Sequence, residues 1–127
     1  MEQRDYILRE IEKIGMILRM IISKLFNKSE PDTEQDDEQL EETATELSDL
    51  ANFDLRGLLQ MNKQDTIKYL ESLEGFNLEN IEDFSMILEK LGFNDKAIWL
   101  LEYCRMKDRT YSPEREDRIR TLKSHIF

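Results

Sequence analysis

The chain contains one cysteine and one histidine, residue types that commonly serve as nucleophile and general base. Cys104 follows Ala97 and Leu101 at helical spacing, which places its thiol on the apolar face of a helix. Burial among apolar side chains raises the pKa of a thiol and makes it inert. His125 lies two residues before the last residue of the sequence, where chains fray, whereas a catalytic base must be held rigidly. We therefore expect a structural cysteine, no catalytic residue and a protein that is not an enzyme.

The carboxylates indicate no specific metal site. Asp32, Glu34 and Asp36 have the two-residue spacing of a calcium-binding loop. However, Asp37 stands where that loop needs glycine, and Thr43 stands where it needs a bidentate glutamate. We therefore predict no metal and no cofactor beyond loose binding of cations by the acidic segment. An enzyme built from scattered carboxylates and tyrosines remains an alternative, because the fold sets the distances between carboxylates.

The net charge of −10 comes from one segment. Residues 30–49 contain ten acids and no lysine or arginine, while the rest of the chain has 18 acids and 18 bases. Such a segment stays hydrated and repels nucleic acid. It is either a solvated loop and helix face or a docking site for a basic partner. The bases of residues 105–123 are mixed with acids, which favours a salt-bridged surface and no nucleic-acid partner.

The elements that position these residues are all expected to be helices. Apolar residues recur at alternating spacings of four and three through residues 3–27, which predicts one long N-terminal helix. Met16 and Met20 fall on its opposite side, one turn apart. A helix with so much apolar surface needs more than one neighbour. It is either central to a bundle or covered by a second subunit.

The rest of the chain divides into an acidic linker, residues 28–36, and a helical body, residues 37–127. The first helix of the body is expected to begin near Asp36 or Asp37 and to be interrupted at residues 52–54. Three asparagines are expected to cap the N-termini of the next helices. Two glycines are expected to end helices in a left-handed conformation, and Ser112-Pro113 is expected to begin the last helix. These positions are Asn62, Asn77, Asn94, Gly75 and Gly92. No segment alternates with period two. The prediction is a single all-α domain over residues 1–127, a bundle of about six to seven helices.

Two segments resemble known families. The stretch LGFNDKAIWLLEYC (residues 91–104) resembles the second half of a tetratricopeptide repeat, with Gly92 closing one helix and Ala97 allowing the next to approach. Leu101 replaces an aromatic residue of that pattern. The resemblance implies antiparallel helix pairs after the long N-terminal helix. The opening RDYILREIEKIG (residues 4–15) resembles a group of small, uncharacterised, all-helical bacterial proteins, which implies a bacterial cytoplasmic protein and no particular activity.

These patterns predict a helical module for protein–protein interaction or oligomerisation. Its partner is expected to be a second copy, forming a homodimer, or another protein. The candidate interface consists of the apolar stripe, the two methionines opposite it and one tryptophan: Ile7, Ile11, Ile14, Leu18, Ile21, Leu25, Met16, Met20 and Trp99. Trp99 points away from the Ala97–Leu101 stripe, so it either packs against a neighbouring helix or anchors a partner.

The alternative function is peripheral association with a membrane surface through the N-terminal helix. Its polar side carries a small excess of bases, among them Arg9, Lys13, Arg19 and Lys24. The apolar runs of the chain are far shorter than the roughly 20 residues needed to cross a bilayer. The first residues also lack the basic leader and small-residue cleavage site of a signal peptide, so we expect a cytoplasmic protein.

Overall fold

The computed structural model describes residues 2–27 and 33–126, with side-chain placement for residues 4–27 and 37–125. These residues form seven helices and no strand, which confirms the predicted all-α fold. The helices are α1 (Glu2–Phe26), α2 (Thr33–Ala51), α3 (Leu55–Leu59), α4 (Lys63–Glu71), α5 (Leu78–Lys90), α6 (Asn94–Lys107) and α7 (Pro113–Ile126).

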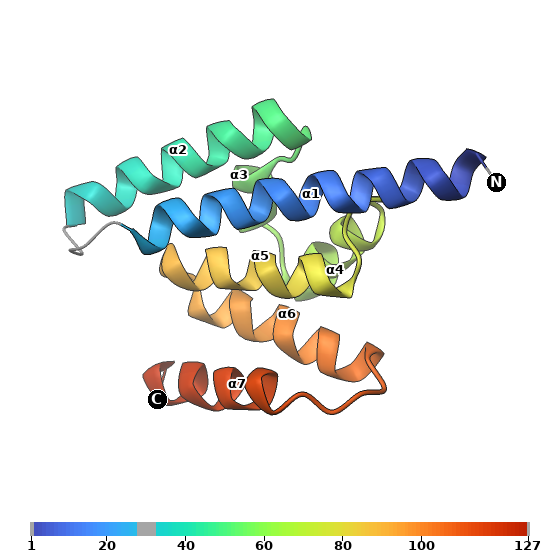
Figure 1. The fold of residues 1–127 in the computed structure, drawn as a ribbon. Helices are drawn as coiled ribbons and strands as arrows, with labels where there is room; N and C mark the ends of the chain where they lie inside the picture. Colours follow the sequence, from blue (N-terminus) through green and yellow to red (C-terminus); the bar gives the residue numbers. More distant parts are fainter. Residues whose placement is uncertain (1, 28–32, 127) are drawn as a thin grey trace.

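Five of the helices lie side by side in the order α2, α1, α5, α6, α7, and each packs against the next (Figure 1). In this layer α1 is antiparallel to α2, and α6 is antiparallel to both α5 and α7. The neighbours α1 and α5 run in the same direction, and the chain between them forms α2, α3 and α4. The short helices α3 and α4 lie behind the layer and contact α2 and α6 respectively. The long first helix therefore lies between α2 and α5 in the described bundle.

The core forms where the apolar stripes of these helices meet. Ile14, Leu18, Ile21 and Leu25 of α1 are buried. Three phenylalanines from different segments fill the centre, with ring centroids 5.1 to 6.1 Å apart: Phe53, Phe76 and Phe84. Offset and edge-on aromatic contacts of this kind stabilise a core beyond the area they bury.

The predicted boundary of the acidic linker is wrong at its C-terminal end. Residues 28–32 lie outside the described residues, but residues 33–36 already belong to α2. Glu34 and Asp36 therefore lie within the first turns of α2. The helix ends where Asn52 adopts a φ of 51°, which confirms the expected interruption at residues 52–54.

Two of the three predicted asparagine caps are confirmed. The side chain of Asn62 accepts a hydrogen bond from the backbone N–H of Asp65, and that of Asn77 accepts one from Asn80. The prediction for Asn94 is wrong, because Asn94 is the first residue of α6 and Phe93 precedes it as the cap. The backbone N–H of Phe93 is instead bonded to the end of α5, through the Leu88 carbonyl.

Gly92 ends α5 in the expected left-handed conformation, with a φ of 94°. The N–H of Gly92 donates to the Glu89 carbonyl at 3.0 Å, and that of Phe93 donates to the Leu88 carbonyl at 2.8 Å. This is the bonding of a Schellman motif. Gly75 is different: its φ is not positive, and α4 has already ended at Glu71. Its role as a left-handed stop was predicted wrongly.

Gly75 is needed for its small size. A Cβ at this position would clash with Ile14 Cγ1 and lie 3.1 Å from the Glu10 carbonyl oxygen, both on α1. The loop between α4 and α5 therefore packs directly against the backbone of the first helix.

Candidate interaction surface

The structure divides the predicted apolar stripe of α1 into a buried part and an exposed part. Ile14, Leu18, Ile21 and Leu25 are buried within one chain, so their assignment to an interface is corrected: they are core residues. The physical reason is that α2 and α5 pack against α1 on both sides along this length. Ile11 is half-buried, and Ile7 is exposed.

The exposed part lies on an N-terminal extension of α1, which we call the overhang and define as residues 4–9. Helix α1 has 25 residues and is about 37 Å long, whereas its neighbour α5 has 13 residues and is about 20 Å long. The first turns of α1 consequently project beyond the other helices (Figure 1). Tyr6, Ile7 and Leu8 are 55%, 38% and 51% exposed there. The apolar stripe thus continues past the point where the chain covers it.

A second exposed apolar region, which we call the outer patch, consists of Met16, Met20 and Leu50. Met16 and Met20 are 67% and 38% exposed on the solvent side of α1, and Leu50 is 44% exposed on α2. Lys24 Nζ and Glu46 Oε1 form an ion pair of 2.8 Å between the two antiparallel helices, so these two residues lie at about the same level. Met20 is one turn before Lys24 and Leu50 is one turn after Glu46, so they lie at the same level along the α1–α2 groove.

Two hollows lie near these regions. A recess of about 180 Å³ begins where the overhang ends. It is lined by apolar side chains and two carboxylates: Glu10, Ile14, Ala51, Ser72, Leu73, Glu74, Gly75 and Phe76.

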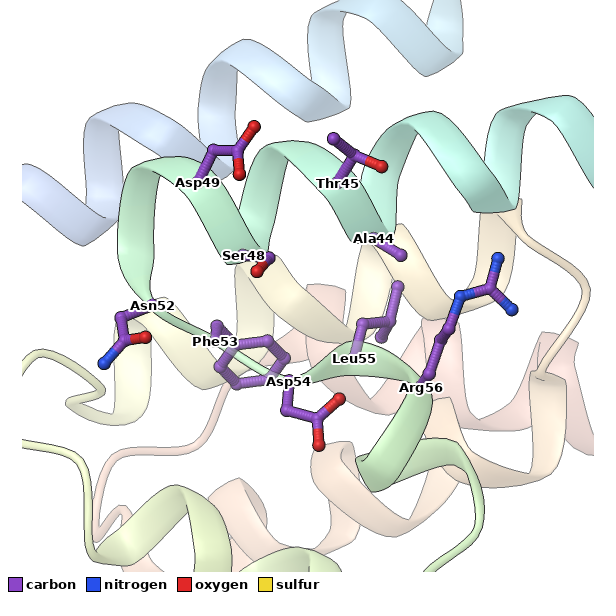
Figure 2. Close-up of a pocket in the computed structure, with 9 residues that line it drawn as sticks. All are labelled: Ala44, Thr45, Ser48, Asp49, Asn52, Phe53, Asp54, Leu55 and Arg56. Atoms are coloured by element: carbon purple, nitrogen blue, oxygen red, sulfur yellow. The ribbon is translucent and has the colours of Figure 1, made fainter.

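A larger hollow, of about 370 Å³, lies between the C-terminal end of α2 and α3 (Figure 2). Figure 2 shows Phe53 between Asn52 and Leu55, with Asp54 and Arg56 on the α3 side. Asp54 accepts a hydrogen bond from the N–H of Gly57 at 3.0 Å, and Arg56 donates to Glu41 at 2.7 Å. Asp54 and Arg56 thus stabilise the local structure through these hydrogen bonds. The described side chains that line the hollow include no nucleophile paired with a base.

Trp99 is half-buried on α6, and Lys96 Nζ lies 4.7 Å from the centroid of its ring. Met106, two turns further along the same face, is 71% exposed. The sequence predicted Trp99 as part of the same interface as α1. In the fold, α5 lies between α1 and α6, so Trp99 belongs to a separate surface.

Cys104 is buried as expected, and its Sγ donates to the Leu78 carbonyl at 3.6 Å. Burial, followed by the nearby Glu82, raises the pKa of this thiol to about 12. Close by, the buried Arg115 of α7 pairs with Glu82 of α5 and donates to Asp108 at 2.9 Å. The hydrogen bond from Arg115 lowers the pKa of the Asp108 carboxyl. These interactions of Arg115 hold α7 against α5 and against the residue that follows α6.

Within the described residues, no three histidine, cysteine, aspartate or glutamate side chains are grouped to hold a metal ion. No helix there combines the length and apolar character needed to cross a membrane. Comparison of the chain with protein-family models, curated protein sequences and solved structures gives no match. The fold thus defines an all-α protein whose exposed apolar side chains are concentrated on one helix.

Sequence reasoning included Ile7, Met16 and Met20 in the candidate interface but missed Tyr6, Leu8 and Leu50. Tyr6 and Leu8 lie to either side of Ile7 at 100° per residue, so the signal was present in the helical periodicity. Leu50 could not be assigned in the same way. Its position at the level of Met20 depends on the packing of α2 against α1.

Proposed function

We propose that the protein is a non-enzymatic helical module that binds another protein chain through the exposed side chains of α1. The observation that carries this proposal is the distribution of exposed large apolar residues. Six of the nine in the described residues belong to α1, among them Tyr6, Leu8 and Met16. A concentration of exposed apolar surface on one element is typical of protein–protein or membrane contact sites.

The stacking of α5, α6 and α7 as antiparallel neighbours supports the further proposal of tetratricopeptide-like helix pairs. In this interpretation the helical body is a scaffold that fixes the direction of α1. A cytoplasmic location is part of the same proposal.

Site-specific photo-crosslinking tests this function in the full chain. A photoreactive residue is placed at Leu8 or at Met16, and as a matched control at the equally exposed Met106 of α6. We expect adducts from the α1 positions, with the purified protein or with a discrete partner in a cell extract. The adducts from Leu8 are expected to be lost when the neighbouring Ile7 is replaced by aspartate. Absence of adducts from both α1 positions, or equal labelling from Met106, would contradict the proposal.

A membrane surface is the second candidate, and the outer patch favours it because the exposed Met16 and Met20 lie among bases. Against it, the fold buries Ile14, Leu18, Ile21 and Leu25, which would have to enter the lipid interface. Flotation with anionic vesicles separates the two functions. We expect the protein to stay at the bottom of the gradient, and co-flotation that is lost in Met16→Asp would favour the membrane.

A further inference from the structure

We propose that the recess at the end of the overhang is a pocket for one basic side chain, a lysine or an arginine, of the protein segment that binds α1. This inference rests on the proposed function, because it assigns the chemistry of the partner at the same surface. The recess combines apolar walls, which suit the aliphatic stem of such a side chain, with acidic groups, which suit its charged end.

The walls and the size of the recess match one long side chain. Ile14 and Phe76 are buried behind it, and Leu73 is half-buried at its side. Its volume of about 180 Å³ is comparable to that of an apolar cavity of about 150 Å³, which holds one benzene molecule. Lysine and arginine bury their aliphatic stems along apolar surface and keep the charged end near water. An apolar recess that opens to solvent suits a side chain of this kind.

The charged side chains at the recess are all acidic. Glu10 of α1 is half-buried, and Glu74 of the loop between α4 and α5 is exposed. Neither carboxylate forms an ion pair or a hydrogen bond with another described residue. No lysine, arginine or histidine is among the side chains that line the recess. Two carboxylates that lack a counter-charge beside an apolar wall give the recess electrostatic complementarity to a cation.

Two helices also end at the recess, and their ends have the same sign. Helix α2 ends at Ala51, and Ser72 is the C-terminal cap of α4; both residues line the recess. The C-terminal end of a helix carries a partial negative charge that favours a cation. The last turn of α2 contains no base that would offset this charge. The walls therefore select an aliphatic stem and the charges select a positive end, a combination that lysine and arginine provide.

The recess is continuous with the exposed stripe of the overhang. Ile7 precedes Glu10 by about one turn on the same face of α1, which places the two residues about 5 Å apart along the helix axis. A segment that covers Ile7 with an apolar side chain therefore reaches the recess with a residue close by. The expected partner segment has an apolar residue next to a base.

A chemical-shift titration of the full chain tests the pocket. The probes are n-butylammonium, which is the side chain of lysine, and n-propylguanidinium, which is that of arginine. We expect saturable shifts of the Leu73 and Gly75 amide signals at probe concentrations on the order of 10 mM, because so few non-hydrogen atoms contact the protein. The uncharged n-butanol should bind several-fold more weakly. Shifts that do not saturate with either probe up to about 100 mM, or that are spread over the acids of α2, would overturn the proposal.

Isosteric variants test the role of the two carboxylates. The double variant Glu10→Gln, Glu74→Gln should weaken binding of the probes about tenfold, since each exposed charge pair contributes a factor of a few. The matched control is Glu12→Gln, Glu38→Gln, which removes the same charge from two exposed acids that do not line the recess. We expect the control to bind as the unsubstituted chain does. An equal loss in the two proteins would assign binding to net charge and overturn the pocket.

Photo-crosslinking from Leu8 shows whether the partner uses the pocket. Adducts should decrease in the Glu10→Gln, Glu74→Gln protein and persist in the control. Adducts that persist in both proteins would overturn this assignment, while the proposed function would stand if Ile7→Asp still removes them. Absence of adducts from the unsubstituted chain would contradict the proposed function itself, and the titration would still decide whether the recess takes a basic side chain.

Discussion

Asn80 shows how one polar side chain connects distant parts of the chain. It is buried at the start of α5, and its Nδ2 donates to the carbonyls of Ile11 at 2.9 Å and Gly75 at 2.7 Å. The first bond crosses to α1 and the second holds the loop that packs on α1. Both N–H groups of this buried amide donate hydrogen bonds. An apolar replacement would leave the two carbonyls without their partner, so this packing requires the amide.

Replacing Asn80 with alanine is therefore expected to lower the free energy of unfolding by about 2–4 kcal/mol, the sum of two lost hydrogen bonds to buried groups. Urea denaturation followed by circular dichroism measures the change. Asn27→Ala, at an exposed asparagine after α1, serves as the control and should change stability by less than about 0.5 kcal/mol. Equal stability of the two variants would show that the bonds of Asn80 are not maintained in solution.

Cys104 provides a pH-dependent prediction. The folded thiol ionises only near pKa 12, against an ordinary value of 9.0, so the unfolded state loses its proton first as the pH rises. The thiol therefore makes its full contribution to the free energy of unfolding below about pH 9. This contribution decreases between about pH 9 and pH 12, and the loss is about 1 kcal/mol at pH 10. The measurement compares urea denaturation at pH 7 and pH 10. Cys104→Ala should show a smaller loss, and an identical loss would assign the effect to other groups.

Among the helices, α5 and the loop before it depend on two glycines for different reasons. Gly92 adopts a left-handed φ in open space, with no atom near an added Cβ. Gly75 has ordinary backbone angles but no room beside Ile14. One position is constrained by backbone conformation and the other by packing, although both follow a helix and precede a phenylalanine in the sequence.

Different substitutions are expected to separate these two causes. Gly92→Ala should destabilise the protein by about 1–2 kcal/mol, and Gly92→Asn by less, because asparagine tolerates the left-handed region. At Gly75 alanine and asparagine should both destabilise, by about 1–3 kcal/mol, with the larger side chain worse. Thermal or urea unfolding of the four variants checks this. The same order at both positions would contradict the assignment.

For the molecule as a whole, the apolar stripe of α1 divides along its length into a buried and an exposed part. Ile14, Leu18, Ile21 and Leu25 belong to the core that α1 forms with α2 and α5, while the overhang is exposed. The acidic helix α2 flanks α1 on one side, and the Lys24–Glu46 ion pair joins the two helices. We therefore expect changes within the overhang to leave the core intact.

Two truncations test this division. Removing residues 1–8 should preserve the helical circular dichroism and cooperative unfolding, because the side chains of the overhang are exposed. Removing residues 1–27 should abolish folding. Four buried aliphatic side chains are lost, each worth about 2–5 kcal/mol, against a total stability of about 5–15 kcal/mol. A cooperative transition in the longer truncation would show that α1 is not essential to the core.

The sequence by itself determined the helices, because periodicity, asparagine caps and the left-handed Gly92 act within a few residues of one another. It predicted the all-α fold, the long first helix and the burial of Cys104 for this reason. Only the tertiary structure decided which part of the α1 stripe is covered. That outcome depends on the unequal lengths of α1 and α5 and on contacts such as Asn80 with Ile11, 69 residues apart. The same long-range packing placed Leu50 at the level of Met20 and separated Trp99 from α1, and no local sequence pattern indicates either relation.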